Sequence, residues 1–233
     1  MVIKRYIYSL LVVLVLPMMF ACSDDDKVPT VVPTASGTVT DRDGNEYHWV
    51  RIGNLDWMTE NLRCDDPYYE DVYNEKWGKN GLTLANDLET EKKYFKLFGN
   101  YYTWQEAMDN APEGWRLPTD DDFKALEIQL GMKESDANRM GWRKGASTLM
   151  TQQGEGTMLD FRYGGEVCNF SYSNIELYHP YDYGYYWTAT DTLVNNEPAS
   201  IARVITPSRN AVNRLVILHE QHFMSVRYVR DAK

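Results

Sequence analysis

The sequence has few of the residues that enzymes most often use for chemistry. Among its 233 residues are only three cysteines and four histidines, and it lacks a serine–histidine–aspartate signature, a nucleophile elbow and a phosphate-binding glycine loop. His219 and His222 are close in sequence, but they lack the His-Glu-x-x-His spacing and fall in a predicted turn, where the two rings need not converge on a metal. We therefore predict a non-catalytic protein, with no catalytic residue, metal site or cofactor.

Positive charge is also scarce. The chain has 24 lysines and arginines against 34 aspartates and glutamates. Removal of residues 1–21 would take away Lys4 and Arg5 and no acid, which changes the net charge from −10 to −12. Nucleic-acid affinity comes mainly from cations that neutralise phosphates, and adsorption to anionic headgroups needs basic clusters. The composition argues against both kinds of partner.

A single long hydrophobic run occurs, at the start of the chain. Lys4 and Arg5 precede an uncharged, mostly apolar stretch over residues 6–21. This stretch is short for a transmembrane helix, and its flanks are typical of a cleaved signal peptide. It ends in Met-Phe-Ala followed by Cys22, which resembles a lipobox, so we predict that Cys22 carries two acyl chains and anchors the protein stably in a membrane. The alternative is an ordinary secreted protein in which Cys22 is incidental.

The residues after Cys22 predict where the anchor lies. Asp24, Asp25 and Asp26 resemble the signal that sends lipoproteins of Bacteroidetes-type bacteria to the outer face of the outer membrane, although a solvated acidic tether would look the same. We expect an outer-membrane lipoprotein that faces the cell exterior. Residues 22–36, with two prolines, predict a lipidated cysteine and an extended stalk. Residues 37–233 are enough for one domain.

The domain should begin with a β-hairpin. β-branched and aromatic residues alternate with polar ones on both sides of Asp43-Gly44, a dipeptide suited to a tight turn. Residues 56–62 continue as a strand.

Two helices should follow. Thr103 and Glu106 have the spacing of a capping box, and this helix should end near Asn110. Thr119 should cap a second helix that ends at Gly131, with three acids in its first turn where the helix dipole favours negative charge. The apolar face of this second helix should contain Phe123, Leu126, Ile128 and Leu130.

Short strands and glycine-rich turns dominate after residue 140. Residues 185–190 and 199–205 have strand composition, and residues 214–218 and 223–229 should pair as a hairpin. The order of elements predicts an α+β domain in which two helices pack on twisted antiparallel sheets with long loops.

Six short segments, in this order, carry a resemblance to a known family. They are TDRDGNEY at residues 40–47, IGNLDWMTENL at 52–62, YTWQEAM at 102–108, GWRLPT at 114–119, YWTAT at 186–190 and SVRYVRD at 225–231. Together they resemble the Fibrobacter succinogenes major paralogous domain family, whose members are exported bacterial proteins, often lipoproteins. The resemblance implies a C-type-lectin-like fold, distantly shared with formylglycine-generating sulfatase-modifying proteins.

The chain departs from the family pattern at two positions. Members of the family often have cysteines where this chain has Ala111 and Tyr228, which suggests that one disulfide has been lost. A disulfide that closes a loop of more than about 100 residues would contribute about 4–5 kcal/mol to the free energy of unfolding in a chain-entropy model. Cys64 and Cys168 are the remaining cysteines, and a bond between them is one way to compensate.

An aromatic segment is the best candidate for a binding surface. Seven tyrosine and tryptophan residues fall between residues 172 and 187. Aromatic rings beside carboxylates suit a saccharide or peptide surface, and in a C-type-lectin-like fold this segment would lie among the long loops that usually carry ligand sites. The alternative is that these rings pack the domain's own loops, and Tyr186 and Trp187 should belong to the core. The predicted ligand-binding residues are Tyr172, Glu176, Tyr178, Tyr181, Asp182 and Tyr183.

These observations predict a surface-exposed, non-catalytic binding or adhesion module for an extracellular glycan or protein. Two alternatives stay open. One is an enzyme or enzyme accessory related to the formylglycine-generating sulfatase-modifying proteins, and the other is a structural subunit of a surface assembly.

Overall fold

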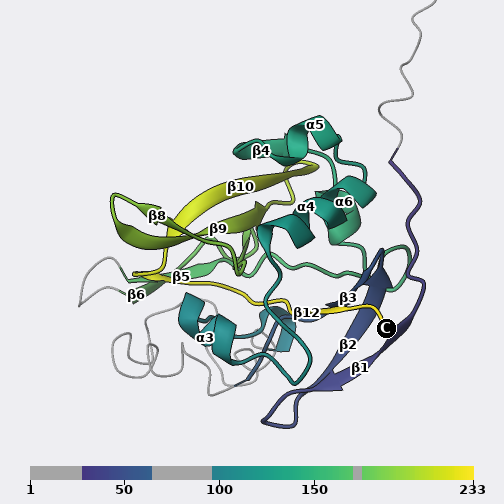
Figure 1. The fold of residues 1–233 in the computed structure, drawn as a ribbon, viewed down its shortest axis with the longest axis horizontal. Coiled ribbons are helices and arrows are strands. Elements are labelled where there is room, and N and C mark those ends of the chain that lie inside the picture. The colour runs from purple at the N-terminus through teal and green to yellow at the C-terminus, as the bar shows by residue number, and fades with distance from the viewer. Residues whose placement is uncertain (1–27, 65–95, 170–174) are drawn as a thin grey trace, which may run out of the picture.

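The computed structural model describes residues 28–64, 96–169 and 175–233 (Figure 1). Cys22, Asp24 to Asp26 and Tyr172 lie outside these residues. Within them, no helix is both long enough and apolar enough to cross a membrane.

The first sheet brings the two ends of the domain together. The predicted hairpin around Asp43-Gly44 is confirmed, and the Asp41 carboxylate closes its turn by accepting the backbone N–H groups of Asp43 and Asn45. The last strand of the chain pairs with the third strand, so the C-terminus lies beside the N-terminal hairpin (Figure 1). The strand order is β1 (Ser36–Thr40), β2 (Glu46–Ile52), β3 (Leu55–Met58) and β12 (Val229–Asp231).

The segment before β1 lies along the domain. Val31 packs against the core, and Ala35 accepts a hydrogen bond from the Arg51 N–H at 2.8 Å. Pro29 lies against Gly131.

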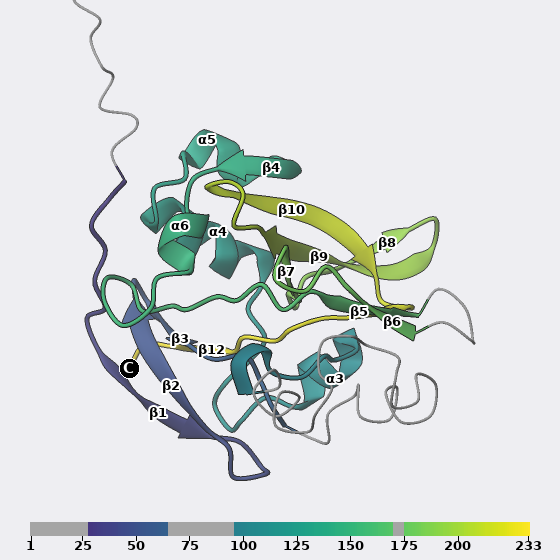
Figure 2. The same ribbon diagram turned by 180° about the vertical axis from the view of Figure 1, so that it is seen from behind.

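Two further antiparallel sheets are formed by the described residues of the second half. The larger has the order β4 (Gly141–Lys144), β10 (Ala211–Leu218), β9 (Glu197–Ile205) and β7 (Gly184–Tyr186), with β8 (Asp191–Val194) also paired to β9. The smaller has the order β11 (His222–Phe223), β5 (Glu166–Asn169) and β6 (Ile175–Tyr178). Figure 2 shows β5 and β6 at the side of the molecule opposite β1 and β2.

The predicted hairpin between residues 214–218 and 223–229 is wrong. β10 pairs with β9 and β4, whereas β11 pairs with β5 and β12 with β3. Gln221, at a φ of 76°, turns the chain away from β10. The hydrophobic alternation identified strand-forming residues but carried no information on which strands they pair with.

The helices begin where their capping residues predict. α3 (Trp104–Asp109) and α4 (Asp120–Gln129) both start with a complete capping box, formed by Thr103 with Glu106 and by Thr119 with Asp122. Two single-turn helices, α5 (Glu134–Ala137) and α6 (Ser147–Met150), were not predicted. The described residues therefore form a sheet-rich α+β domain.

The predicted apolar face of α4 is wrong at one residue. Ile128 is 36% exposed, whereas Glu127 is fully buried. The buried positions Phe123, Leu126 and Glu127 follow the three- and four-residue spacing of one helix face. Glu127 is accommodated there because two buried arginines, Arg143 and Arg203, bind its carboxylate from the neighbouring sheet.

The C-terminal motif is structural. Arg227 is buried and donates hydrogen bonds to the carbonyls of Met58 (3.0 Å) and Leu159 (2.7 Å) and to the Asn61 side chain (2.5 Å). The predicted core positions of Tyr186 and Trp187 are confirmed, with exposures of 1% and 0%.

Tyr228 fills the position where family members often have a cysteine. It is fully buried, its hydroxyl donates to the Ala107 carbonyl of α3 at 2.9 Å, and Ala111 packs against the same cluster. The two positions therefore share one part of the core, where a large ring now provides the packing.

Candidate binding site on the three-stranded sheet

The smallest sheet has two chemically different faces. Side chains alternate between faces along a strand, and Val167, Leu177 and Phe223 form an apolar cluster with Tyr101. The neighbouring residues Glu166, Cys168 and His222 therefore point to the other face. The register places His222 directly opposite Cys168.

These three side chains meet. The His222 Nδ1 atom lies 2.9 Å from the Glu166 Oε2 atom and 3.6 Å from the Cys168 sulfur. One nitrogen, one oxygen and one sulfur ligand atom thus lie within 4.8 Å of one another. Glu166 is 7% exposed and Cys168 is 1% exposed, so this polar cluster is largely removed from solvent.

Burial keeps the thiol protonated. Burial first, and then the neighbouring Glu166 carboxylate, raises the pKa of the Cys168 thiol far above its usual 9.0. Burial and the charge of Glu166 also raise the pKa of the Tyr185 hydroxyl. Without a nearby cation, Cys168 is therefore a neutral thiol and a poor nucleophile.

A tight turn follows β6 and carries the predicted tyrosines. The Tyr181 N–H donates to the Tyr163 carbonyl at 2.7 Å, and the Gly165 N–H donates to the Tyr183 carbonyl at 2.7 Å. Within the turn, the N–H of Tyr183 donates to the His179 carbonyl at 3.1 Å. The turn comprising His179 to Tyr183, which we call the tyrosine turn, is thus clamped to residues 163–165.

The backbone of the tyrosine turn has an unusual conformation. His179 and Tyr181 have φ angles of 55° and 69° although neither is glycine. A left-handed conformation is uncommon in bulky residues and costs about 1–3 kcal/mol, and such residues concentrate at functional sites. The Tyr181 side chain is 55% exposed, and its ring packs against Phe98 in a T-shaped arrangement with a centroid distance of 5.3 Å.

The predicted ligand-binding residues divide into three groups. Tyr181 and Asp182 are exposed on the tyrosine turn, while Tyr178 and Tyr183 are half-buried. Glu176 lies opposite Cys168 in the strand register, but its side chain, like the whole of Tyr172, is outside the described residues. The rings of Tyr178 and Tyr183 both pack against His179, and Tyr183 also packs against Tyr185.

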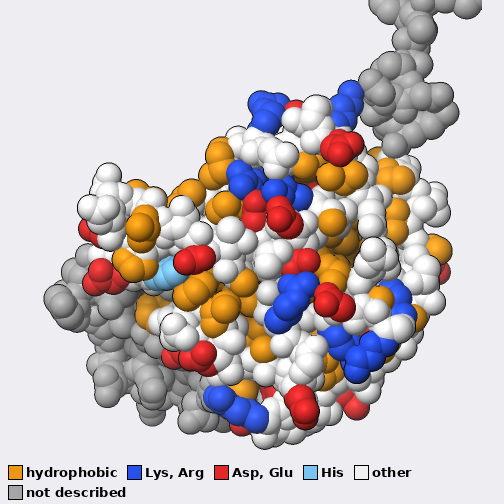
Figure 3. Space-filling view, in the orientation of Figure 1, with side chains coloured by type: hydrophobic (Ala, Val, Ile, Leu, Met, Phe, Trp, Pro, Cys, Tyr) orange, Lys and Arg blue, Asp and Glu red, His pale blue; other side chains and the backbone are white. Residues whose placement is uncertain are grey.

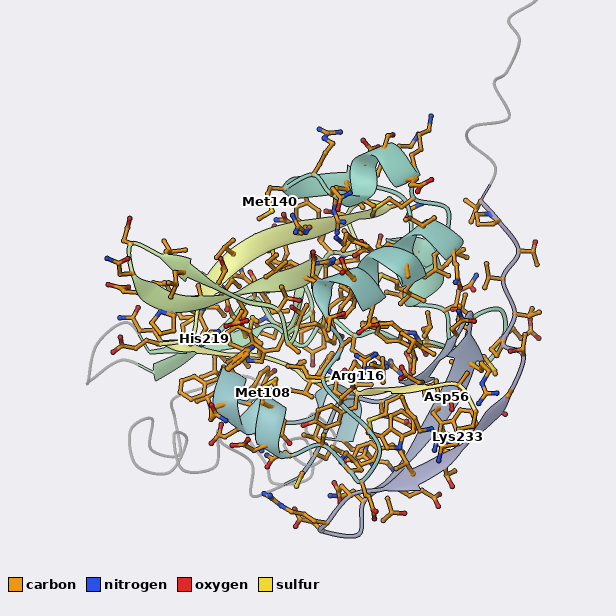
Figure 4. All side chains as sticks on the ribbon, viewed as in Figure 1. Asp56, Met108, Arg116, Met140, His219 and Lys233 are labelled. Carbon is orange, nitrogen blue, oxygen red and sulfur yellow. The ribbon has the colours of Figure 1, made fainter. Side chains whose placement is uncertain are left out.

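Sequence reasoning did not identify the cluster of Glu166, Cys168 and His222. The i, i+2 spacing of Glu166 and Cys168 in a strand was a usable signal, but the pairing of β11 with β5 was not predictable from either segment. His219, in contrast, bonds to Ser200 at 2.5 Å and stacks on Trp104 with ring centroids 4.2 Å apart. The two histidines thus have separate partners. Figures 3 and 4 show His219 at the surface beside hydrophobic side chains, with Met108 of α3 nearby.

The disulfide considered between Cys64 and Cys168 is not formed. Cys64 is buried in the apolar cluster around Trp187, whereas Cys168 lies beside His222. A bond between these two residues therefore does not compensate for the disulfide whose loss the family resemblance suggests.

A polar hollow with a volume of about 430 Å³ shares one residue, Tyr163, with the contacts that hold the tyrosine turn. Tyr163, whose carbonyl holds the turn, lines this hollow with Arg209, Asn210 and several serine and threonine hydroxyls. No sequence signal joins these residues, because they come from three separate segments.

The domain is thus a sheet-rich α+β module with an exposed tyrosine turn and a separate, largely buried polar cluster. Residues 50–230, well over half of the chain, match the family model of the Fibrobacter succinogenes major domain, and the chain belongs to this family. No curated protein and no solved structure matches the sequence significantly.

Proposed function

We propose that the protein is a lipid-anchored, surface-exposed binding or adhesion module that has a C-type-lectin-like fold and no catalytic role. Its ligand would be an extracellular glycan, contacted by the tyrosine turn without calcium. The lipid at Cys22 would hold the chain in the outer membrane with the domain outside the cell.

The observation that carries this proposal is the exposed Tyr181 ring on a clamped turn. Among the tyrosine, tryptophan and phenylalanine residues that the structure describes, Tyr181 is the one of which more than half is exposed. Its backbone is fixed by the hydrogen bond to Tyr163, so little conformational freedom would be lost on binding. A flat ring beside the exposed Asp182 carboxylate offers an apolar surface for a sugar face and an acceptor for its hydroxyl groups.

The polar hollow lined by Tyr163 supports the same ligand class. Serine, threonine and asparagine side chains can exchange hydrogen bonds with sugar hydroxyls, and a volume of about 430 Å³ is in the range of small-ligand sites. Tyr163 belongs to both features, because it lines the hollow and its backbone carbonyl accepts the hydrogen bond from the Tyr181 N–H.

A glycan array tests the proposal. The full chain, purified in mild detergent, is applied with and without added calcium. We expect binding to a subset of glycans in both conditions, and Tyr181→Ala should weaken it about tenfold, the equivalent of about 1.4 kcal/mol. Leu193→Ala is the matched control, because Leu193 is 66% exposed but lies on β8.

Two results would contradict the glycan proposal. If no glycan binds, the ligand class is wrong and a protein partner becomes the better explanation. If binding occurs but Tyr181→Ala and Leu193→Ala have equal effects, the tyrosine turn is not the binding surface.

A further inference from the structure

The cluster of Glu166, Cys168 and His222 has no role in the proposed glycan site. The Glu166 carboxylate and the His222 ring pair with each other at 2.9 Å and the Cys168 sulfur joins them, so three potential metal ligands of different chemistry gather on one face of this sheet. We propose that these three residues form a binding site for a divalent transition metal ion, with zinc as the best-fitting ion.

The distance between the sulfur and nitrogen ligands fits a small tetrahedral ion, and the oxygen ligand lies within reach of the same ion. With zinc–sulfur and zinc–nitrogen distances of about 2.3 and 2.05 Å, tetrahedral coordination places the two ligand atoms about 3.6 Å apart. The Cys168 sulfur and the His222 Nδ1 atom are 3.6 Å apart. The Glu166 oxygen, now 2.9 Å from Nδ1, would have to retreat by about 0.4 Å to reach the corresponding nitrogen–oxygen separation of about 3.3 Å.

The donor set selects the kind of metal. A thiolate and an imidazole favour zinc and related transition metals, whereas calcium and magnesium prefer sites made entirely of oxygen. A bound dication would also reverse the effect of Glu166 on Cys168, because a coordinated thiol loses its proton. Three protein ligands leave a fourth position for water or another ligand.

The backbone holds the ligands in place. Glu166 and Cys168 are two residues apart on β5 and therefore share a face, while β11 places His222 opposite Cys168. Because strand pairing fixes all three Cα positions, the site needs only side-chain adjustments to accept an ion. Such preorganisation distinguishes this cluster from a chance meeting of long surface side chains.

The chain also contains a natural comparison for this cluster. His48 and Glu60 form the same kind of pair, with Nδ1 and Oε1 2.8 Å apart, but the pair is at the surface. It is not among the three-residue groups of possible metal ligands found in the described part of the chain. Glu60→Gln is therefore a matched control for Glu166→Gln.

Metal titration of the full chain tests the proposal. The protein is stripped of metal, kept reduced, and titrated with cobalt chloride and then with zinc chloride. We expect one cobalt ion per chain with a thiolate-to-cobalt charge-transfer band, which zinc then removes. Cys168→Ala should abolish the band, and Cys64→Ala, which also removes a buried thiol, should retain it.

The glutamate variants keep the test independent of folding defects. Glu166→Gln preserves shape and should weaken cobalt binding about tenfold or more, while Glu60→Gln should leave it unchanged. The proposal is overturned if the folded chain binds no cobalt at micromolar concentrations. It is also overturned if the band persists in Cys168→Ala, or if Glu166→Gln and Glu60→Gln bind cobalt equally well.

Discussion

At the scale of single residues, Glu127 and Ile128 exchange the roles that their hydrophobicity predicts. The Glu127 carboxylate is buried between Arg143 and Arg203, whereas Ile128 is 36% exposed. Removing one partner of a buried ion pair leaves uncompensated charge, so Glu127→Gln should lower the free energy of unfolding by about 3–5 kcal/mol. Ile128→Ala should change it by no more than about 0.5 kcal/mol, as is usual at the surface. Urea denaturation measures both, and a larger effect from Ile128→Ala would contradict the structure.

Asp120 should make stability depend on pH. Burial alone would raise the pKa of this carboxyl group, but the ion pairs with Arg214 and Arg203 outweigh burial and hold the pKa well below its usual 3.8. In the unfolded chain Asp120 takes up a proton near pH 3.8, while in the folded chain it stays ionised. Its contribution to stability is therefore complete above about pH 5 and is lost as the pH falls below about 4.

A variant isolates this contribution. Asp120→Asn should lower the unfolding free energy by about 3–5 kcal/mol at neutral pH, because two arginines lose their partner. Its difference from the wild type should begin to shrink below about pH 4, because the unfolded wild-type chain then takes up a proton at Asp120 while the folded chain still holds this carboxylate ionised. Asp121→Asn is the control, since the Asp121 side chain is 87% exposed. A difference between Asp120→Asn and wild type that is independent of pH would show that the charge is not the cause.

At the scale of elements, Gly165 allows the chain just before β5 to approach the end of β6 and the start of the tyrosine turn. Gly165 has a φ of 77°, and an added Cβ would lie 2.3 Å from the Tyr178 carbonyl oxygen. Gly154 has a similar φ of 71° but no atom within 4 Å of such a Cβ. Gly154→Ala should thus cost only the backbone strain, about 1 kcal/mol, and Gly165→Ala should cost more because the turn must also move. Equal costs in urea denaturation would rule out the close approach.

The elements also show how far sequence reasoning reaches. Local chemistry was sufficient for the hairpin at Asp43-Gly44 and for both capping boxes, because each depends on residues within four positions of one another. It failed where distant segments decide. Glu127 could not be assigned to the core without Arg203, which is 76 residues away. The pairing of His222 with Cys168 joins residues that are 54 positions apart. They lie on two strands, β11 and β5, that are not neighbours in the chain.

The candidate sites divide in the same way, into features that local sequence predicts and features that depend on distant segments. Exposure of Tyr181 and Asp182 agreed with their polar, turn-rich surroundings. The metal-ligand cluster was missed because a lone glutamate, cysteine and histidine carry no motif until the register of β5 and β11 is known.

At the scale of the whole molecule, the described chain begins on one side and the three-stranded sheet lies on the other. Residues 28–35 run along the first sheet, whereas β5 and β6 lie at the opposite side in both ribbon views (Figures 1 and 2). An anchor that precedes residue 28 would therefore leave the β5–β6 side directed away from its point of attachment. This arrangement suits a protein that presents a binding surface to its surroundings.

The proposed anchor makes a final prediction about the whole molecule. In the native bacterial host, Cys22→Ser should abolish incorporation of labelled fatty acid and release the chain from the membrane fraction, because two acyl chains are what makes such anchoring stable. Replacing Asp24, Asp25 and Asp26 by asparagine should leave the fatty acid in place but protect the chain from protease added to intact cells, if these acids direct it to the outer face. The matched control is replacement of the exposed residues Asp43, Glu46 and Glu113 by their amides, which removes the same charge far from the cysteine. A Cys22→Ser chain that stays membrane-bound would show that lipid at this residue is not the anchor, and protease sensitivity of the asparagine variant would show that the acidic triplet is only a tether.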